Sequence, residues 1–149
     1  MPRYAELRQC ARTERALLTR LMLGVVVAHQ TGTPPEWLLE AVDTVLPDLQ
    51  RPHPIRVKLS YWQHQDGDWV IGPGLLVRED MDPAERLAAI ALHLQDQVFD
   101  QTDEAWGEAR PYCPGHPHPP DPRVTDGTAV WTCPRDGHVL APIGQLTEH

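Results

Sequence analysis

The sequence lacks the short signatures by which most enzyme classes are recognised. It contains no glycine-rich phosphate loop, no nucleophile-elbow serine, no HExxH metal-binding pair and no dinucleotide fingerprint. No nucleophile stands next to a general base at a spacing that indicates catalysis. We therefore expect a protein whose function is not enzymatic.

Basic charge and long apolar runs are also scarce. Lys58 is the only lysine among thirteen basic residues, against twenty-one acidic ones, and the net charge is −8. The imbalance lies in residues 79–108, where nine acidic side chains accompany Arg86 alone. Binding to duplex nucleic acid needs a basic surface, so this class is excluded. The most apolar stretch, 16–28, is too short for a transmembrane helix and contains Arg20.

Cysteine is limited to three residues, an odd number. The chain starts with an arginine-rich segment and shows no signal peptide. These features predict the reducing interior of the cytoplasm. Cys10 lies on a predicted helix and is interpreted as a small core residue, which leaves Cys113 and Cys133 as candidate metal ligands.

The overall composition is that of a globular protein, with 41% apolar and 23% charged residues among 149. The predicted fold class is α+β. Residues 1–108 are expected to form an α+β body of helix, helix, β-hairpin and helix. Residues 109–149 are expected to form a ribbon-like β unit, with Trp106 as an anchor at the boundary between the two.

Two helices are expected to open the body as an antiparallel helical hairpin. The first is predicted over residues 2–30, where apolar residues recur at three- and four-residue spacing, with Gly32 as its stop. The second is predicted to begin in a capping box at 33–36 and to end before Pro47. Its buried face is expected at Trp37, Leu38, Ala41, Val42 and Val45.

The middle of the chain is predicted to form a β-hairpin. Asp66-Gly67 between the apolar runs 55–64 and 69–77 favours a two-residue turn, and Pro73-Gly74 is expected to bend the second strand. This register places His64 opposite Trp69 and Trp62 opposite Ile71.

A third helix is predicted to start at the Asp82 cap, with Pro83 in its first turn. After it, Asp126-Gly127 predicts a second hairpin, and 139–143 a further short strand. This C-terminal unit has too small a core to hold about 35 residues by burial alone, so a metal, a covalent link or docking on the body is expected to help. The apolar stripe of the third helix is expected at Leu87, Ile90, Ala91, Leu94 and Val98.

Two segments twenty residues apart repeat a pattern of Cys, Pro, a variable residue, His or Asp, another variable residue and His. In a tight turn, a side chain three residues after a cysteine points into the same space as the thiol, while backbone N–H groups support the thiolate. The spacing therefore suits metal ligation from both segments. They are Cys113-Pro114-Gly115-His116-Pro117-His118 and Cys133-Pro134-Arg135-Asp136-Gly137-His138.

These turns resemble the zinc-ribbon and rubredoxin-knuckle group, in which two Cys-Pro-x-Cys-Gly turns hold one metal between them. The resemblance covers residues 111–143 and implies a metal-bearing hairpin. The sequence differs from the group at His116 and Asp136, which replace the second ligand of each turn, and at Pro117, where the group has glycine. It matches at Cys113, Pro114, Cys133, Pro134 and Gly137.

Zinc takes four ligands in a tetrahedron. A Cys₂His₂ set is a commoner zinc environment than one that includes aspartate, which favours His138 as the fourth ligand, with Asp136 and His118 as alternatives. A closed set of four predicts a structural ion, whereas an open set would bind and activate water. The predicted ligands are Cys113, His116, Cys133 and His138.

Other interpretations of these residues stay open. Ribbons that have lost their metal keep the same hairpin, so Cys113 and Cys133 could be buried thiols in a metal-free ribbon. In an oxidising compartment they could form a disulfide. The other histidines carry no metal prediction: His29 and His93 are placed on helices, and His64 is interpreted as a packing partner of a tryptophan.

The leading functional hypothesis is a non-enzymatic, intracellular interaction module that presents the ribbon-like unit to a protein partner. One alternative is a metal-dependent hydrolase with an open site at Cys113, His116 and Cys133 and with Asp136 or His118 as general base.

A second alternative is weak binding of single-stranded nucleic acid. It requires exposed tryptophans on which bases stack and nearby arginines that contact phosphates. The residues available for it are Trp106, Trp131, Arg110, Arg123 and Arg135.

Overall fold

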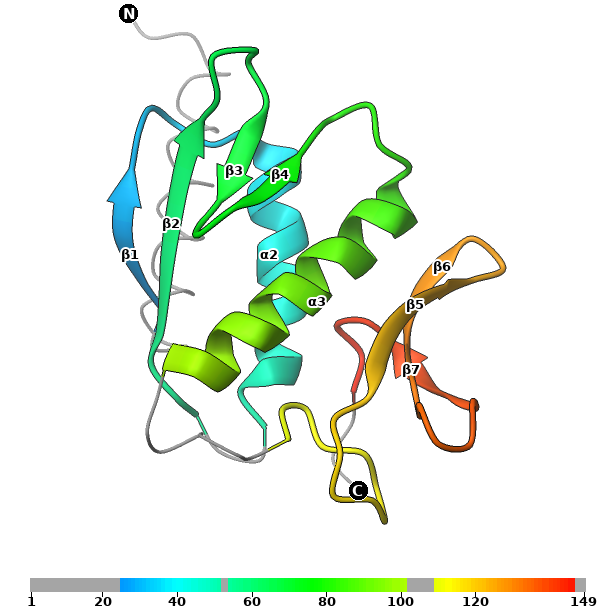
Figure 1. The fold of residues 1–149 in the computed structure, drawn as a ribbon. Helices are drawn as coiled ribbons and strands as arrows, with labels where there is room; N and C mark the ends of the chain where they lie inside the picture. Colours follow the sequence, from blue (N-terminus) through cyan, green and yellow to red (C-terminus); the bar gives the residue numbers. More distant parts are fainter. Residues whose placement is uncertain (1–24, 52–53, 102–108, 147–149) are drawn as a thin grey trace, which may run out of the picture.

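A computed structural model of the protein describes residues 25–51, 54–101 and 109–146 (Figure 1). This part of the chain forms two helices, one four-stranded sheet and one three-stranded sheet, which confirms the predicted α+β class. The elements are β1 (Val25–Gln30), α2 (Glu36–Leu49), β2 (Val57–Gln63), β3 (Trp69–Ile71), β4 (Leu75–Val77), α3 (Pro83–Gln101), β5 (Asp121–Thr125), β6 (Thr128–Thr132) and β7 (Val139–Pro142).

The first sheet has the strand order β1-β2-β3-β4. β1 and β2 run parallel, and α2 supplies the crossover that a parallel pair needs. The other pairs are antiparallel. Along β2, buried Val57, Leu59 and Tyr61 alternate with more exposed residues, so one face of this sheet is turned towards the helices.

The helix predicted over residues 2–30 is wrong at its C-terminal end, because residues 25–30 form β1. Residues 1–24 lie outside the described part of the chain. Three consecutive valines begin β1, and their branched side chains favour a strand when a neighbouring strand is available. Val25 pairs with Val57, so this segment joins the sheet instead of a helical hairpin.

The predicted capping box at 33–36 is also wrong. α2 begins at Glu36 after an extended N-cap residue, Pro35, and no side chain caps it. Two prolines in a row explain the later start, since the residue before a proline is driven towards extended backbone.

The predicted end of α2 before Pro47 is wrong as well, because the helix continues to Leu49. Pro47 lies in the last turn, where its missing N–H removes a single helical hydrogen bond. The predicted buried face is confirmed: Leu38, Val42 and Val45 are buried, and Trp37 and Ala41 pack against the core.

The turn between β2 and β3 is one residue longer than predicted. Gly67 donates its N–H to the His64 carbonyl at 2.9 Å and has φ +90°, the geometry of a type I turn closed by a glycine bulge. A shift of one residue exchanges the faces of a strand, and here it turns Trp69 towards the core. The observed pairs are Gln63 with Trp69, Trp62 with Val70 and Tyr61 with Ile71, so the predicted pairs His64–Trp69 and Trp62–Ile71 are wrong.

The expected bend at Pro73-Gly74 is a complete reversal, in which residues 69–77 divide into the antiparallel strands β3 and β4. α3 begins as predicted, because the Asp82 carboxylate accepts the Glu85 N–H at 3.1 Å. Its apolar stripe is confirmed at Ile90, Ala91, Leu94 and Val98, which are buried, and at Leu87, which is partly buried.

The second sheet has the order β5-β6-β7 and is antiparallel throughout. Its first turn confirms the Asp126-Gly127 prediction, since both residues have positive φ (50° and 75°) and Thr125 pairs with Thr128. α3 lies between the two sheets, against β2 and β4 on one side and β5 and β6 on the other (Figure 1).

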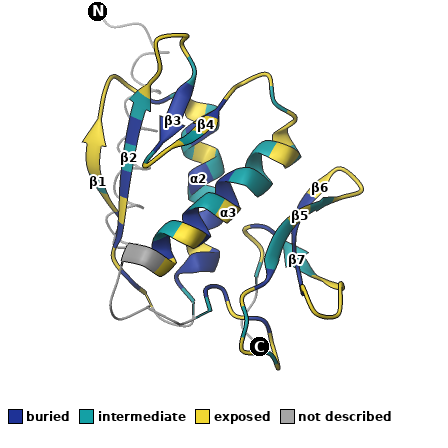
Figure 2. Cartoon of the chain, in the orientation of Figure 1, coloured by how far each residue is buried: buried dark blue, intermediate teal, exposed yellow. Residues whose placement is uncertain are grey.

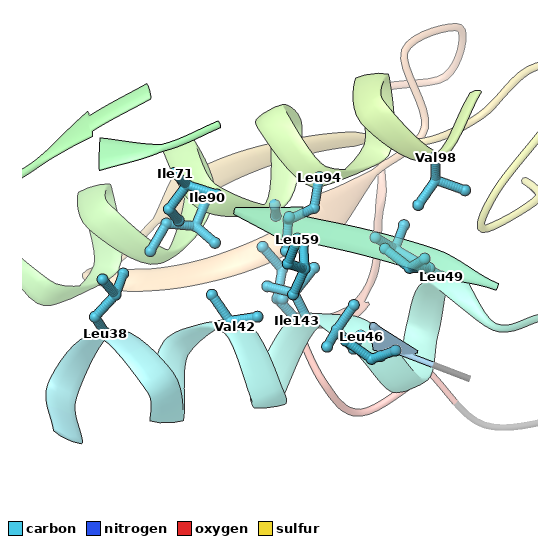
Figure 3. Close-up of a cluster of buried hydrophobic side chains, with 14 of the residues drawn as sticks. Leu38, Val42, Leu46, Leu49, Leu59, Ile71, Ile90, Leu94, Val98 and Ile143 are labelled. Atoms are coloured by element: carbon cyan, nitrogen blue, oxygen red, sulfur yellow. The ribbon is translucent and has the colours of Figure 1, made fainter. Parts of the chain in front are cut away.

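Buried residues gather where the helices face the two sheets (Figure 2). The apolar core contains Leu46 and Leu94 from the helices, Leu59 from β2 and Ile143 from the C-terminal segment (Figure 3). Trp131 on β6 belongs to the same core, which therefore includes residues of both sheets. The predicted boundary at residues 108 and 109 borders on 102–108, outside the described residues, and stays a prediction.

Buried polar groups also join the second sheet to the helices. The carboxyl group of Asp48 on α2, 1% exposed, accepts hydrogen bonds from Trp131 Nε1 at 2.8 Å and from the backbone N–H groups of Gly144 and Leu146. Gln95 on α3 donates to the Arg110 and Pro120 carbonyls at 3.1 and 2.9 Å. These links fix the start of β5 and the end of β7 against the two helices.

Neither of the helices in the described ranges combines the length and the apolar composition that crossing a bilayer requires.

Candidate metal centre

The two Cys-Pro segments lie at the same end of the second sheet. Asp121 at the start of β5 pairs with Thr132 at the end of β6, so the chain enters β5 and leaves β6 side by side. We call residues 113–118 the first Cys-Pro loop and residues 133–138 the second Cys-Pro loop. Both lie at the end of the sheet opposite the β5–β6 turn (Figure 1).

The two loops are closed by the same backbone hydrogen bond. In each, the N–H of the cysteine donates to the carbonyl of the histidine five residues later: Cys113 to His118 at 3.3 Å and Cys133 to His138 at 2.9 Å. Each loop also contains a glycine with positive φ. The inner turns differ, because the Cys113 carbonyl accepts from the His116 N–H and the Cys133 carbonyl from the Gly137 N–H, so the sequence repeat corresponds to a shared closing bond only.

Both cysteines are free thiols, and both are buried. His116 stands between them, with Nδ1 at 3.7 Å from Cys113 Sγ and at 3.3 Å from Cys133 Sγ. The N–H of Asp136 also points to Cys133 Sγ at 3.4 Å, an interaction that supports a thiolate. The prediction that the second hairpin brings the two thiols together is confirmed.

His118 completes a group of four. Ligand atoms of Cys113, His116, His118 and Cys133 all lie within 4.8 Å of one another. The rings of His116 and His118 have centroids 4.9 Å apart and are tilted by 43°. The cluster is thus a set of two sulfur and two nitrogen donors, compatible with a metal-binding knuckle.

Asp136 and His138 form the outer side of the cluster. Asp136 Oδ2 lies 3.7 Å from His116 Nε2 and 3.7 Å from His138 Nδ1. Cys133, Asp136 and His138 also form a group whose ligand atoms lie within 4.8 Å of one another. His138 is 55% exposed, against 21% for His116.

Burial raises the pKa of the Cys113 thiol to about 11. A hydrogen bond with Cys133 and the charges of Cys133 and Asp136 act in the same direction. The free Cys113 thiol is therefore protonated at neutral pH, and a metal ion must displace its proton in order to bind.

Of the four predicted ligands, Cys113, His116 and Cys133 lie together in the group that also contains His118. His138 lies instead in the group with Cys133 and Asp136. The identity of the fourth ligand stays a prediction. The repeated pattern made both His118 and His138 candidates for the fourth ligand. The sequence alone did not indicate which of the two side chains would lie beside the thiols.

Among the described residues, three further histidines lie outside the metal-binding groups. His29 is exposed on β1, not on a helix as predicted. His93 lies on α3 as predicted, with Nε2 at 2.7 Å from the Gly72 carbonyl. His64 pairs with Asp66 at 3.3 Å.

The structure corrects the prediction of exposed stacking residues for single-stranded nucleic acid. Trp131 is fully buried and donates to Asp48, and Arg110 is only 3% exposed, with Nη1 at 3.3 Å from the Leu49 carbonyl. Trp106 lies outside the described residues. Sequence reasoning missed these structural roles, because nothing local in the sequence pairs residues 83 positions apart.

Comparisons of the chain with protein-family models, with curated proteins and with solved structures found no match.

Proposed function

We propose that the protein binds one structural zinc ion through Cys113, His116, His118 and Cys133. The observation that carries this proposal is the convergence of four donors, two thiols and two imidazoles, within 4.8 Å of one another at one end of a small sheet. Thiolate and imidazole are the ligands of structural zinc sites, and four of them close its tetrahedron.

The distances support a tetrahedral centre. Zn–S bonds of about 2.3 Å and Zn–N bonds of about 2.05 Å, at the tetrahedral angle, separate a sulfur and a nitrogen ligand by about 3.6 Å. His116 Nδ1 lies at 3.7 and 3.3 Å from the two sulfurs. Both sulfur–nitrogen distances are therefore close to the value that the ion requires.

The choice of His118 as fourth ligand rests on an unpaired nitrogen. His118 Nδ1 lies 3.4 Å from the Pro119 carbonyl, a position that suits a donated proton and leaves the lone pair on Nε2. That Nε2 is buried and has no hydrogen-bond partner. A buried polar atom without a partner costs about 1–3 kcal/mol, a cost that a bond to zinc removes.

We propose further that the zinc-bound unit is a non-enzymatic interaction module for a protein partner. Four protein ligands leave no coordination position for a reacting water. The ion would hold the two Cys-Pro loops in one arrangement on the second sheet, next to the exposed side chain of Tyr112, which precedes the first loop. Retention of both thiols as ligands also favours a reducing compartment.

The test is the metal content per chain, measured by elemental mass spectrometry after purification under reducing conditions. The wild type should carry one zinc ion, and Cys133→Ser and His118→Asn should carry much less. Cys10→Ser changes the third thiol and serves as the matched control, which should retain one ion. A wild type without zinc, or a Cys133→Ser variant that keeps its zinc, would contradict the proposal.

Cobalt substitution tests the closed ligand set independently. The visible spectrum of the Co²⁺ protein should be that of a four-coordinate ion with two sulfur ligands, and it should not change when azide is added. A spectrum that responds to azide would instead indicate an open position and favour a metal-dependent hydrolase.

A further inference from the structure

Asp136 occupies the position in the second Cys-Pro loop that His116 occupies in the first. It contacts the cluster twice: its N–H points to Cys133 Sγ at 3.4 Å, and its Oδ2 lies 3.7 Å from His116 Nε2. On its other side, Oδ2 lies 3.7 Å from His138 Nδ1. The carboxylate thus stands between the partly buried imidazole of His116, 21% exposed, and the exposed imidazole of His138, 55% exposed.

The chemistry of imidazole determines which nitrogen of His116 must carry the proton when the ring binds an ion. A neutral ring has one nitrogen that carries a proton and one that offers a lone pair. His116 turns Nδ1 towards both sulfurs, so its proton must sit on Nε2 if Nδ1 is to bind an ion. The oxygen that faces Nε2 is Asp136 Oδ2. A carboxylate in this place fixes the tautomer, orients the ring and makes the ligand more basic.

We infer that Asp136 is a positioning residue of the zinc centre, which holds His116 with its proton on Nε2, and that His138 supports Asp136 from the solvent side and is not a ligand. The inference rests on the proposed function. The present separation of 3.7 Å exceeds a hydrogen bond, and binding of the ion is expected to draw Nε2 towards the carboxylate, to about 2.8 Å.

The test compares zinc affinity, measured by competition with a chromophoric chelator, among full-length variants. Asp136→Asn keeps an acceptor oxygen but loses the charge and should bind zinc about 10-fold more weakly; Asp136→Ala loses both and should approach 100-fold. His138→Gln should stay within about 3-fold of the wild type. Asp126→Asn is the matched control. It makes the same charge change in a β-turn that accepts asparagine, and it should leave the zinc affinity unchanged.

A second readout separates positioning from simple attraction between charges. In the zinc-bound wild type, nitrogen-resolved NMR should show the His116 proton on Nε2 and in slow exchange with water. In Asp136→Ala this signal should broaden or disappear, while the Co²⁺ spectrum keeps its two sulfur and two nitrogen ligands.

Three results would overturn the inference: unchanged affinity in Asp136→Ala, equal losses in the Asn and Ala variants, or a changed ligand set in the Co²⁺ spectrum of Asp136→Ala, which would make Asp136 a ligand itself. A wild type that binds no zinc would defeat the proposed function instead, so the two failures are distinguishable.

Discussion

The two sheets of this protein are held in place by different means. The four-stranded sheet contributes a row of buried apolar side chains, Val57, Leu59, Tyr61 and Ile71, to a core that both helices cover. The three-stranded sheet contributes fewer, chiefly Ala129 and Trp131, and is attached to the helices by buried hydrogen bonds of Asp48 and Gln95. A sheet with little apolar surface can thus be positioned by a few specific hydrogen bonds. A single substitution at one of these bonds should therefore destabilise the second sheet more than a single substitution destabilises the first.

The largest expected effect is at the carboxyl group that joins the sheets. Asp48→Ala leaves Trp131 Nε1 and the N–H groups of Gly144 and Leu146 without an acceptor, and should lower the free energy of unfolding by about 4 kcal/mol. Chemical denaturation measures the loss, and hydrogen exchange should place it in β6 and β7. Asp96→Ala, an exposed change on α3, should stay within about 0.5 kcal/mol, and an equal effect of the two changes would contradict this role for Asp48.

A glycine at the end of the second sheet should give the next largest effect. Gly144 has φ +92°, and a Cβ there would lie 2.7 Å from Thr44 Cγ2 and 2.9 Å from the Thr44 carbonyl oxygen. Gly144→Ala should therefore cost about 3 kcal/mol, because it adds backbone strain to a close contact with α2. Gly74→Ala, which meets nothing within 4 Å, is the matched control, and its midpoint in urea should hardly move.

The pH dependence of stability should differ between the metal-free and the zinc-bound protein. The Cys113 pKa is raised from 9.0 to about 11 in the fold, so the protonated thiol is favoured there. The resulting stability is present below pH 9 and is lost as the pH rises through 11. Its size is roughly 2 kcal/mol in the metal-free protein.

Denaturation curves at pH 8 and pH 11, with and without one equivalent of zinc, measure this difference. Cys113→Ser should remove it, whereas Cys10→Ser should leave it in place. If metal-free Cys113→Ser and the metal-free wild type lose the same stability between pH 8 and pH 11, other groups cause the pH dependence.

The smallest effect on stability is expected at the start of α3, away from the second sheet. Asp82→Ala removes the acceptor of the Glu85 N–H at the start of α3 and should cost about 1 kcal/mol. Asp82→Asn retains an acceptor and should behave like the wild type in thermal denaturation. Zinc affinity should be the same in all three proteins, and a loss of affinity in Asp82→Ala would show that the two regions are more tightly coupled than we infer.

The features that follow from local sequence were predictable. The Asp82 cap, the stripe of α3, the Asp126-Gly127 turn and the repeated Cys-Pro loops depend on neighbouring residues, and the structure confirms them. β1 was not predictable in this way, because 25–30 continue an apolar helical spacing and only the pairing with β2 makes them a strand.

The candidate site was predicted in its chemistry but not in its detail. The spacing of the cysteines indicated two turns that face each other, and the hairpin between them brings the thiols together. His118 and His138 each follow a cysteine by five residues, so this spacing alone does not predict which of the two is more exposed. The register of the first hairpin was missed because Asp-Gly suits two different turns. Gly67 has positive φ in both of them, whereas Asp66, which a type I′ turn would also place at positive φ, does not have it here.

The most direct test of the account is hydrogen exchange of the wild type in the presence and absence of one equivalent of zinc. We predict that zinc slows exchange at least 10-fold at the N–H groups of Cys113 and Cys133, which close the two Cys-Pro loops, and along β6. Exchange along β2 should change far less. Equal protection of both sheets with and without zinc would contradict the claim that an ion at these cysteines and histidines holds the second sheet together.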